Sequence, residues 1–214
     1  MFHIRFQVKK KFNIFEISLP FFLSFWNFGS MKNGRGRINQ KIENNRKFLM
    51  KINITDKRRL GNSGLKISPI CLGTMMFGGR TNEQEARGII DHAFEKGVNF
   101  IDTADVYNKG ISEEIVGRGI AANRSDWVLA SKVGNPMGKG THQKGLSRKW
   151  MLEAMDQSLE RLKTDYIDIW YLHLPDPQTP IEETLETISQ VLRLGKPVTG
   201  VFRISADGRL QTFA

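Results

Sequence analysis

The sequence has one cysteine, Cys71, so no disulfide bond can form within the chain. Small secreted domains with little hydrophobic core depend on several disulfides, and this chain is excluded from that class. The same absence favours a reducing compartment, and we expect the protein to be cytoplasmic. Cys71 lies in the apolar run 70–72, where a lone cysteine is usually a small buried hydrophobic residue, and we assign it no chemistry.

A long apolar run is also absent. Residues 12–28 are rich in aromatic side chains, but Glu16 and Pro20 interrupt them, and the stretch falls short of the roughly 20 apolar residues that cross a membrane. The stretch follows a basic start, as in a signal peptide, yet no small-residue cleavage site comes after it. We expect no membrane association, with a weak targeting or membrane-surface segment as the alternative.

Clusters of metal ligands are missing as well. His3, His92 and His142 are scattered, without cysteine or histidine partners at the spacings of zinc sites, so we predict no metal site. Residues 134–140 follow a predicted strand and are rich in glycine, but these glycines are one residue too close for a phosphate-binding loop. We interpret this stretch as a flexible loop near the substrate.

The formal net charge of +10 is concentrated near the N-terminus. Residues 1–49 contain ten Lys or Arg and two acidic residues, whereas the other 165 residues contain 22 basic and 20 acidic ones. A basic nucleic-acid binder would depend on residues 1–49 alone, and we expect no nucleic-acid partner. The polar composition of residues 31–47 is typical of disorder. We interpret residues 1–49 as a disordered or non-native extension, with Met50 as the natural start.

Residues 50–196 alternate between strand and helix patterns. A predicted β-hairpin over residues 58–68 precedes a strand at 70–73, and three further strands lead to Asp102, Lys132 and His173. A helix pattern follows each strand, and connections of this length imply parallel strands. The turn after the first strand lacks the G-x-G-x-x-G of an open dinucleotide-binding sheet. The pattern therefore favours an α/β fold that is a partial TIM-type (β/α)8 barrel, with about four βα units and a fifth-strand remnant.

Two of the predicted helices have capping-box spacing at their start. Thr81 with Gln84 predicts a helix from Thr81, and Thr179 with Glu182 predicts another from Thr179. The second helix has an apolar stripe that we expect to face the core: Ile181, Leu185, Ile188 and Leu192.

Four residues that can hold or move a proton stand at or just after predicted strand ends: Asp102, Tyr107, Lys132 and His173. In parallel α/β barrels, catalytic residues gather at this rim. Carbonyl reduction needs an acid that protonates the oxygen as negative charge builds there. Tyrosine suits that role if an adjacent cation lowers its pKa from about 10, and we expect Lys132 to supply the cation and Asp102 to hold its ammonium. His173 would orient the carbonyl or assist the proton relay.

These segments resemble the aldo-keto reductase family. Residues 101–107 together with 112–117 are similar to its aspartate–tyrosine signature, residues 131–132 to its lysine strand, and residues 165–173 to its histidine strand. The resemblance extends over about residues 58–195. It implies a (β/α)8 barrel that reduces a small-molecule carbonyl substrate with NADPH as hydride donor.

The resemblance also implies roles for individual residues. Asp102, Tyr107, Lys132 and His173 would be the catalytic tetrad. The cofactor-binding residues would be Asp102 and the three residues at the end of the first strand, Gly73, Thr74 and Met75, which would line the nicotinamide ribose.

The sequence departs from the family after about Lys196. The fifth strand of the family ends in a Gly-Val-Ser-Asn-like motif, whereas residues 200–203 read Gly-Val-Phe-Arg. Codons permitted for residues 197–207 can encode the expected motif in a shifted frame, and we hypothesise a single frameshift near Lys196. Residues 50–196 would then be the N-terminal half of a barrel, and residues 197–214 an aberrant C-terminal tail.

Two functional interpretations remain open. The first is an NADPH-dependent oxidoreductase that reduces an aldehyde or ketone, with Tyr107 as general acid. The second is a truncated, catalytically inactive relative or a non-enzymatic interaction subunit, because half of the family's cofactor cradle lies beyond the resemblance. Half a barrel would also leave its first and fifth strands with unpaired edges, through which two copies could self-associate.

Overall fold

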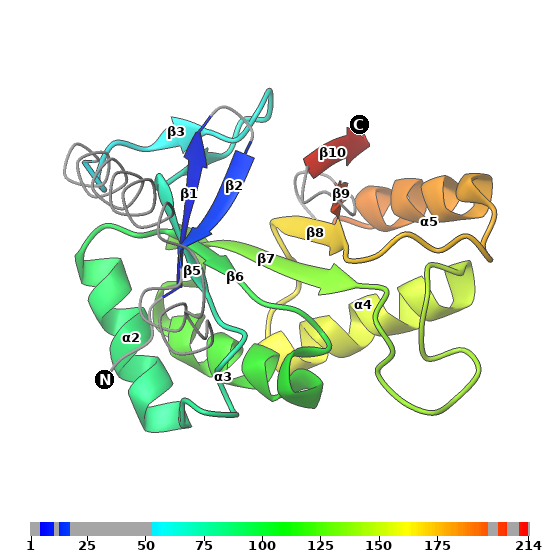
Figure 1. Ribbon diagram of the computed structural model, residues 1–214, viewed down its shortest axis with the longest axis horizontal. Coiled ribbons are helices and arrows are strands. Elements are labelled where there is room, and N and C mark those ends of the chain that lie inside the picture. Colours follow the sequence, from blue (N-terminus) through cyan, green and yellow to red (C-terminus); the bar gives the residue numbers. More distant parts are fainter. Residues whose placement is uncertain (1–4, 11–12, 18–52, 197–200, 205–209, 214) are drawn as a thin grey trace, which may run out of the picture.

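The computed structural model describes residues 5–10, 13–17, 53–196, 201–204 and 210–213. The strands are β1 (Arg5–Lys10), β2 (Asn13–Ile17), β3 (Arg58–Arg59), β4 (Lys66–Ile67), β5 (Ile70–Gly73), β6 (Phe100–Asp102), β7 (Val128–Val133), β8 (Ile169–Leu172), β9 (Val201–Ile204) and β10 (Leu210–Phe213). The helices are α2 (Glu83–Glu95), α3 (Ile111–Ile120), α4 (Arg148–Leu162) and α5 (Ile181–Arg193), with 3-10 turns η2 (Tyr107–Gly110) and η3 (Ala121–Asp126). Figure 1 shows their arrangement.

The centre of the fold is a run of parallel strands. The main sheet has the order β10-β9-β8-β7-β6-β5-β1-β2, and β5 to β9 pair in parallel with their neighbours in the sequence. Helices α2, α3, α4 and α5 connect successive strands of this run, and β3 and β4 form a separate hairpin before it. The predicted fold class, a hairpin followed by four βα units and a fifth strand, is confirmed.

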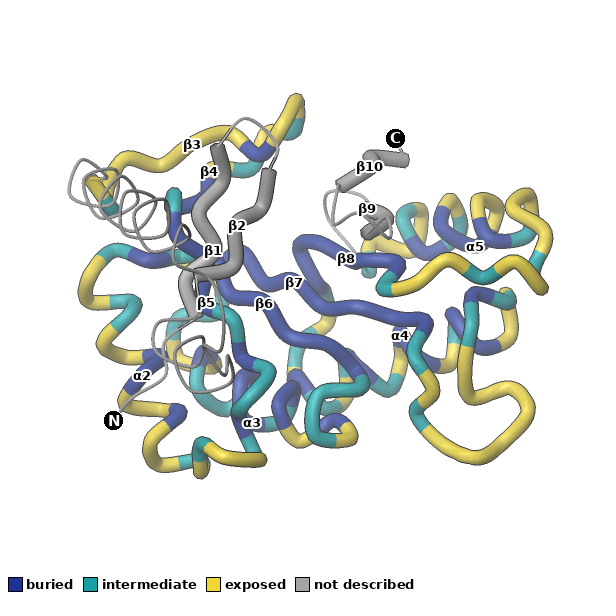
Figure 2. Tube along the Cα trace, in the orientation of Figure 1, coloured by how far each residue is buried: buried dark blue, intermediate teal, exposed yellow. Residues whose placement is uncertain are grey.

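The two faces of the parallel strands pack against different partners, because side chains alternate along a strand. On the helix side, Leu72, Ile101 and Leu129 join the helix residues in the larger core cluster. On the other side, Cys71 and Phe100 lie in a second buried cluster with residues of the β3–β4 hairpin. Figure 2 shows the central strands as a continuous buried band. These strands therefore form a rigid base for the side chains at their carboxyl ends.

The expectation of unpaired strand edges is not met in the structure. The free side of β5 pairs antiparallel with β1, and the free side of β9 pairs antiparallel with β10. The expectation was wrong because it assigned no strand to the segments before residue 50 and after residue 204, which lie outside the family-like region. Most of the segment 1–49 lies outside the described residues, so its interpretation as a disordered or non-native extension stays a prediction.

The start of α2 lies one residue later than its predicted cap. Asn82, not Thr81, is the N-cap: its side chain accepts from the Glu85 N–H at 3.0 Å, and Glu85 accepts from the Asn82 N–H at 3.1 Å. The backbone of Thr81 is used in the preceding turn, where its N–H donates to the Met76 carbonyl. Asparagine is at least as good an N-cap as threonine, so the capping box moves along the chain by one residue.

Helix α5 differs from its prediction at its start and in its buried face. No side-chain hydrogen bond caps it at Pro180, because the Thr179 hydroxyl donates to Asp176 instead, at 2.8 Å. Of the predicted stripe, Ile188 is buried, but Ile181 and Leu185 are 49% and 37% exposed. The buried face is offset from the apolar stripe and consists of Thr184, Thr187, Ile188 and Val191.

Within the described residues, no helix is both long enough and apolar enough to cross a bilayer.

Candidate active site

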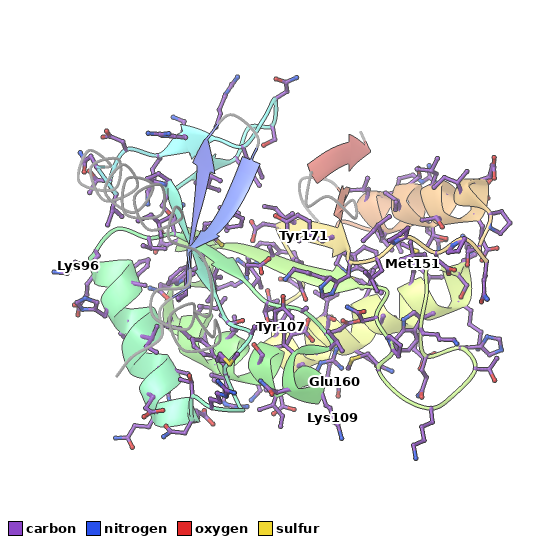
Figure 3. All side chains as sticks on the ribbon, viewed as in Figure 1. Lys96, Tyr107, Lys109, Met151, Glu160 and Tyr171 are labelled. Atoms are coloured by element: carbon purple, nitrogen blue, oxygen red, sulfur yellow. The ribbon has the colours of Figure 1, made fainter. Side chains whose placement is uncertain are left out.

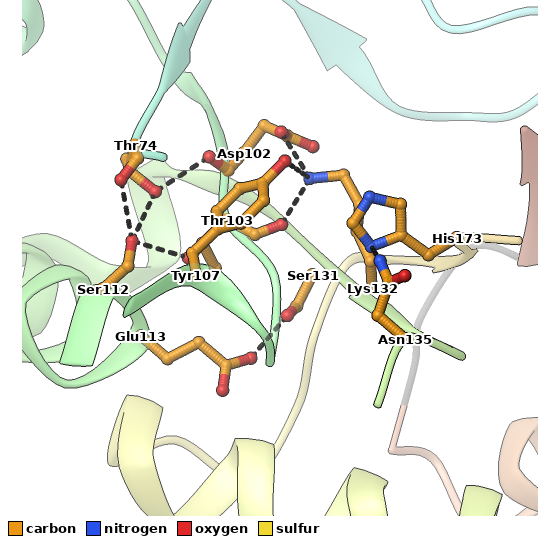
Figure 4. Close-up of polar contacts among 10 residues, drawn as sticks. All are labelled: Thr74, Asp102, Thr103, Tyr107, Ser112, Glu113, Ser131, Lys132, Asn135 and His173. Carbon is orange, nitrogen blue, oxygen red and sulfur yellow. Dashed lines mark hydrogen bonds and ion pairs between the residues drawn. The ribbon is translucent and has the colours of Figure 1, made fainter. Parts of the chain in front are cut away.

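The four predicted catalytic residues come together at the carboxyl ends of neighbouring strands. Asp102 ends β6, Lys132 lies near the end of β7, His173 directly follows β8, and Tyr107 begins the turn η2 after β6. Figure 4 shows their side chains converging, and Figure 3 places Tyr107 within the molecule. Because the strands are parallel and adjacent, residues far apart in the sequence reach one edge of the sheet.

Lys132 is the centre of the site. Its Nζ donates to Asp102 Oδ2 at 2.7 Å, to the Thr103 carbonyl at 2.6 Å and to the Tyr107 hydroxyl at 3.0 Å. An ammonium has three N–H donors, so these contacts use all of them. Burial lowers the pKa of Lys132, but the negative charge of Asp102 and the contact with Tyr107 more than offset it, and the net shift is upward. Lys132 is therefore a fixed cation beside the phenol oxygen.

His173 approaches the same phenol from β8. Its ring lies edge-on to that of Tyr107, with ring centroids 6.1 Å apart and an interplanar angle of 82°. Burial, followed by the nearby Lys132 charge, lowers the pKa of His173 from 6.5 to about 4. The imidazole is therefore neutral at neutral pH.

Asn135 defines the tautomer of that neutral imidazole. The Asn135 Nδ2 lies 2.8 Å from His173 Nδ1. An amide nitrogen only donates, so with the amide oriented as in the structure, Nδ1 accepts and the ring proton is on Nε2. His173 thus has an Nε2–H donor at its other end.

The predicted cofactor-binding residues lie beside Asp102 at the end of β5. Gly73 is paired with Asp102 in the sheet register. Thr74 is fully buried, and its hydroxyl contacts the Asp102 carbonyl at 3.0 Å and the Ser112 hydroxyl at 2.9 Å. Met75 follows in the loop and is partly buried. The Thr74 side chain therefore joins the end of β5 to β6 and α3.

The segment after Tyr107 has an unusual backbone. Asn108 and Lys109 both adopt positive φ angles, 49° and 57°, and Gly110 follows at 91°. Such left-handed non-glycine residues cost free energy and are enriched at functional sites. Asn108 is held there because its side-chain amide donates to the carbonyls of Met75 and Phe77, at 3.0 and 2.7 Å. This contact ties the tyrosine turn to the loop after β5.

A second ion pair lies below the tetrad. Glu113 is fully buried, accepts a short hydrogen bond from the Ser131 hydroxyl, and pairs with Arg161 Nε at 2.7 Å. Ser131 precedes Lys132 in β7, and Arg161 lies near the end of α4. The pair therefore joins α3, β7 and α4 directly behind the lysine.

The sequence assigns no role in the site to Asn135, Asn108 or the Glu113–Arg161 pair. The sequence predicts Asn135 only as part of a flexible loop near the substrate, although its position two residues after the end of β7 is a usable signal. Glu113 and Arg161 are 48 residues apart, and no local pattern joins them. No group of three or more His, Cys, Asp or Glu side chains with metal-binding geometry occurs among residues placed by the structure.

Comparisons with known proteins agree on one family. Residues 69–197, more than half of the chain, match the aldo/keto reductase family. The chain is 43% identical over 141 residues to "Uncharacterized oxidoreductase YqkF" of Bacillus subtilis (strain 168), a match that covers 65% of this chain and 45% of that protein. It is 42% identical over 144 residues to a "Probable voltage-gated potassium channel subunit beta" of Arabidopsis thaliana, covering 64% of this chain and 43% of that protein.

A solved structure shows the same likeness in three dimensions. The holo form of the aldo-keto reductase AKR11C1 from Bacillus halodurans superposes with a TM-score of 0.63 and 39% sequence identity. The superposition covers 70% of this chain and 51% of that chain. This chain thus spans about half the length of the relatives that it matches, and the matched region ends within one residue of the predicted departure near Lys196.

Proposed function

Since this chain belongs to the aldo/keto reductase family, we propose that it carries the acid–base site of an NADPH-dependent oxidoreductase that reduces an aldehyde or ketone. The observation that carries the proposal is the triple contact of Lys132 with Asp102, Thr103 and the Tyr107 hydroxyl. A phenol next to a buried, permanently charged ammonium can release its proton to an oxygen that is gaining negative charge.

Tyr107 is the acid in this proposal. Lys132 carries no lone pair in its charged form, so it cannot accept the phenol proton, and the Tyr107 O–H is directed away from the ammonium. As negative charge develops on the carbonyl oxygen, Tyr107 transfers its proton there, and Lys132 stabilises the phenolate that remains. Asp102 keeps the ammonium in place and balances its charge.

His173 orients the substrate. With Nδ1 occupied by Asn135, the neutral ring presents Nε2–H, which can donate to the carbonyl oxygen. Its lowered pKa, about 4, keeps it from competing with Tyr107 as the proton source at neutral pH. His173 and Tyr107 would then hold one oxygen between two donors.

The hydride must come from a cofactor, because tyrosine, lysine, histidine and aspartate supply protons but no hydride. NADPH, when bound, supplies that hydride. Gly73, Thr74, Met75 and Asp102 would hold its nicotinamide ribose, and their position at the same sheet edge as Tyr107 fits such a group. The Thr74 hydroxyl and backbone already bond Asp102, Ser112 and Phe77, so Thr74 would fix the position of the neighbouring residues around that ribose. We place the reaction in the cytoplasm, on the ground that the sequence holds a single cysteine.

The decisive experiment measures NADPH binding by the full chain. NADPH fluorescence is recorded as the protein is added, and reduction of 4-nitrobenzaldehyde is followed as loss of NADPH absorbance. We expect saturable binding by the wild type and by Tyr107→Phe, with reduction in Tyr107→Phe slower by roughly 10²- to 10⁴-fold. Tyr166→Phe removes the hydroxyl of a residue that precedes β8, at the other end of the strand from His173, and should keep the wild-type rate. No binding at high protein concentration would contradict the proposal.

A second candidate is a non-enzymatic interaction subunit. The observation in its favour is the 42% identity to a protein whose name describes a potassium channel β subunit, together with a match limited to about half of each relative. This candidate predicts that NADPH binding is absent, or that it occurs without turnover of the aldehyde. The fluorescence and absorbance measurements therefore discriminate the two functions. We also propose that two copies of this chain self-associate, although not through β5 and β9, whose edges are paired with β1 and β10. The mass in solution tests this.

A further inference from the structure

Asp105 is a buried carboxyl group that the proposed reaction does not use. It is fully buried between β6 and the tyrosine turn, three residues after Asp102 and two before Tyr107. Its Oδ1 accepts from the Val106 N–H at 2.6 Å, and its own N–H donates to the Lys132 carbonyl at 3.3 Å. Its Oδ2 has no hydrogen-bond partner among the residues that the structure describes. A buried carboxylate oxygen without a partner is costly when it is charged.

The charged groups that face Asp105 come from three elements. Glu113 of α3 repels a negative charge on it, whereas Arg161 of α4 and Lys132 of β7 attract one. Both cations already have a carboxylate partner: Lys132 pairs with Asp102, and Arg161 pairs with Glu113, each at 2.7 Å. Asp105 is thus a third carboxyl group beside two complete ion pairs, and in the part of the chain that the structure describes no further cation balances it.

The pKa of Asp105 reflects its burial and these neighbouring charges. Burial first, and then the Glu113 charge, raise the pKa of Asp105 from 3.8 to about 7, although the Val106 N–H and the two cations oppose the shift. Near neutral pH the group therefore exists in both its neutral and its charged form.

We propose that Asp105 is a positioning residue whose protonation sets how strongly Lys132 polarises Tyr107, an inference that rests on the proposed acid role of Tyr107. While Asp105 is neutral, the ammonium has one carboxylate neighbour, and its field acts on the phenol. When Asp105 is charged, a second negative group lies near the ammonium and offsets part of that field. Tyr107 then holds its proton more firmly, so the site is a stronger proton donor below neutral pH than above it.

A purely structural role makes a different prediction. If Asp105 serves only to cap the Val106 N–H, asparagine at this position does the same through its own side-chain oxygen. The tyrosine turn would keep its shape, and the ionisation of Tyr107 would not change. The Asp105→Asn variant therefore separates the two roles.

The experiment is an NMR titration of the full chain with ¹³C-labelled aspartate carboxyls and ¹³C-labelled tyrosine ring carbons. Signals of Asp105 and Tyr107 are assigned with Asp105→Asn and Tyr107→Phe. In the wild type, we expect the Asp105 carboxyl to titrate near neutrality and the Tyr107 signal to show an inflection at the same pH. In Asp105→Asn this inflection disappears, and Tyr107 ionises at a lower pH, with at least roughly a threefold larger phenolate fraction at a given pH. The control Asp126→Asn, which changes an exposed aspartate in η3, should leave both signals unchanged.

Two results would overturn the inference: an Asp105 carboxyl that titrates together with the exposed aspartates, or a Tyr107 titration that is identical in wild type and Asp105→Asn. If Asp105→Asn does not fold, the coincidence of the two inflections in the wild type decides the question. The titration needs neither cofactor nor turnover, so a chain that fails to bind NADPH removes the proposed function while the coupling of Asp105 to Tyr107 is still read directly.

Discussion

The amide of Asn135 holds His173 in one tautomer through a contact of 2.8 Å between Asn135 Nδ2 and His173 Nδ1. The donor is neutral, so it adds no negative charge that would stabilise an imidazolium. Burial, followed by the Lys132 charge, lowers the pKa of His173 to about 4, and the neutral amide does not oppose that shift. The single neutral tautomer of His173 beside Tyr107 therefore depends on an amide, rather than a carboxylate, at position 135.

Replacing Asn135 by aspartate should favour the charged form of the His173 imidazole. In Asn135→Asp, a carboxylate would accept from a protonated Nδ1, so the tautomer changes and the charged ring is favoured. We expect the pKa of His173 to rise from about 4 to near or above its ordinary 6.5, as measured by NMR titration of the histidine Cε1 signals. Asn62→Asp adds the same charge at an exposed position and should leave the His173 titration in place. A low His173 pKa in both variants would show that Asn135 does not control the ring.

The ion pair of Lys132 and Asp102 should dominate the stability of the site. Their side chains are 5% and 11% exposed, so removing one partner leaves an unpaired buried charge. We expect Lys132→Met to lower the free energy of unfolding by about 3–5 kcal/mol, measured by urea denaturation. The double variant Asp102→Leu with Lys132→Met removes both charges and should regain most of that loss. Equal destabilisation by the single and double variants would contradict a buried, coupled pair.

The site residues at strand ends were predictable because two local signals coincide there, an apolar run and a titratable residue that ends it. Asp102, Lys132 and His173 all carry this signature, and parallel pairing brings them to one edge. The supporting contacts were not predictable in the same way. Glu113 pairs with Arg161, which lies 48 residues away in the sequence, and Asn108 donates to the carbonyl of Met75, which lies 33 residues away. Such partners depend on how helices pack, which no single segment encodes.

Helix α5 shows the same limit for a helix face. Its apolar residues repeat at helical spacing, and that pattern predicted the helix itself. Which side is buried depends on the neighbouring elements, and here Thr184 is turned inward, where its hydroxyl donates to the Leu146 carbonyl at 3.3 Å. Ile181 and Leu185 consequently remain exposed. Periodicity gives the existence of an element more securely than its orientation.

Two glycines in helices offer a matched test of packing. Gly117 lies in α3 where a Cβ atom would meet the Leu162 carbonyl oxygen at 2.3 Å, whereas a Cβ at Gly88 in α2 would meet nothing within 4 Å. The same substitution should therefore have opposite effects. We expect Gly88→Ala to stabilise by roughly 0.5–1 kcal/mol through helix propensity, and Gly117→Ala to destabilise by about 1–3 kcal/mol or more through overpacking. Thermal unfolding of both variants checks the signs, and a stabilised Gly117→Ala would contradict the close contact of α3 with α4.

Asp105 should make the stability of the chain fall as pH rises towards neutrality. Between its ordinary pKa of 3.8 and its folded value of about 7, the folded chain holds a proton that the unfolded chain has lost. The free energy of unfolding therefore decreases with rising pH in this window and is constant, as far as Asp105 is concerned, above it. The full effect is at most about 4 kcal/mol, the free-energy equivalent of the pKa difference.

His173 changes the free energy of unfolding with pH in the opposite direction, so its contribution must be separated from that of Asp105. Its folded pKa of about 4 lies below its ordinary 6.5, so the unfolded chain binds the extra proton between these values, and stability rises with pH there. Comparing Asp105→Asn with the wild type cancels this contribution, because both contain His173. Urea denaturation is measured at pH 4, 6 and 8. The free energy of unfolding of Asp105→Asn, relative to that of the wild type, should increase from each pH to the next, by at most about 4 kcal/mol in total. A stability difference that is the same at all three pH values would mean that Asp105 has the same pKa in the folded and unfolded chain, and that its charge does not change near neutral pH to alter the field on Tyr107.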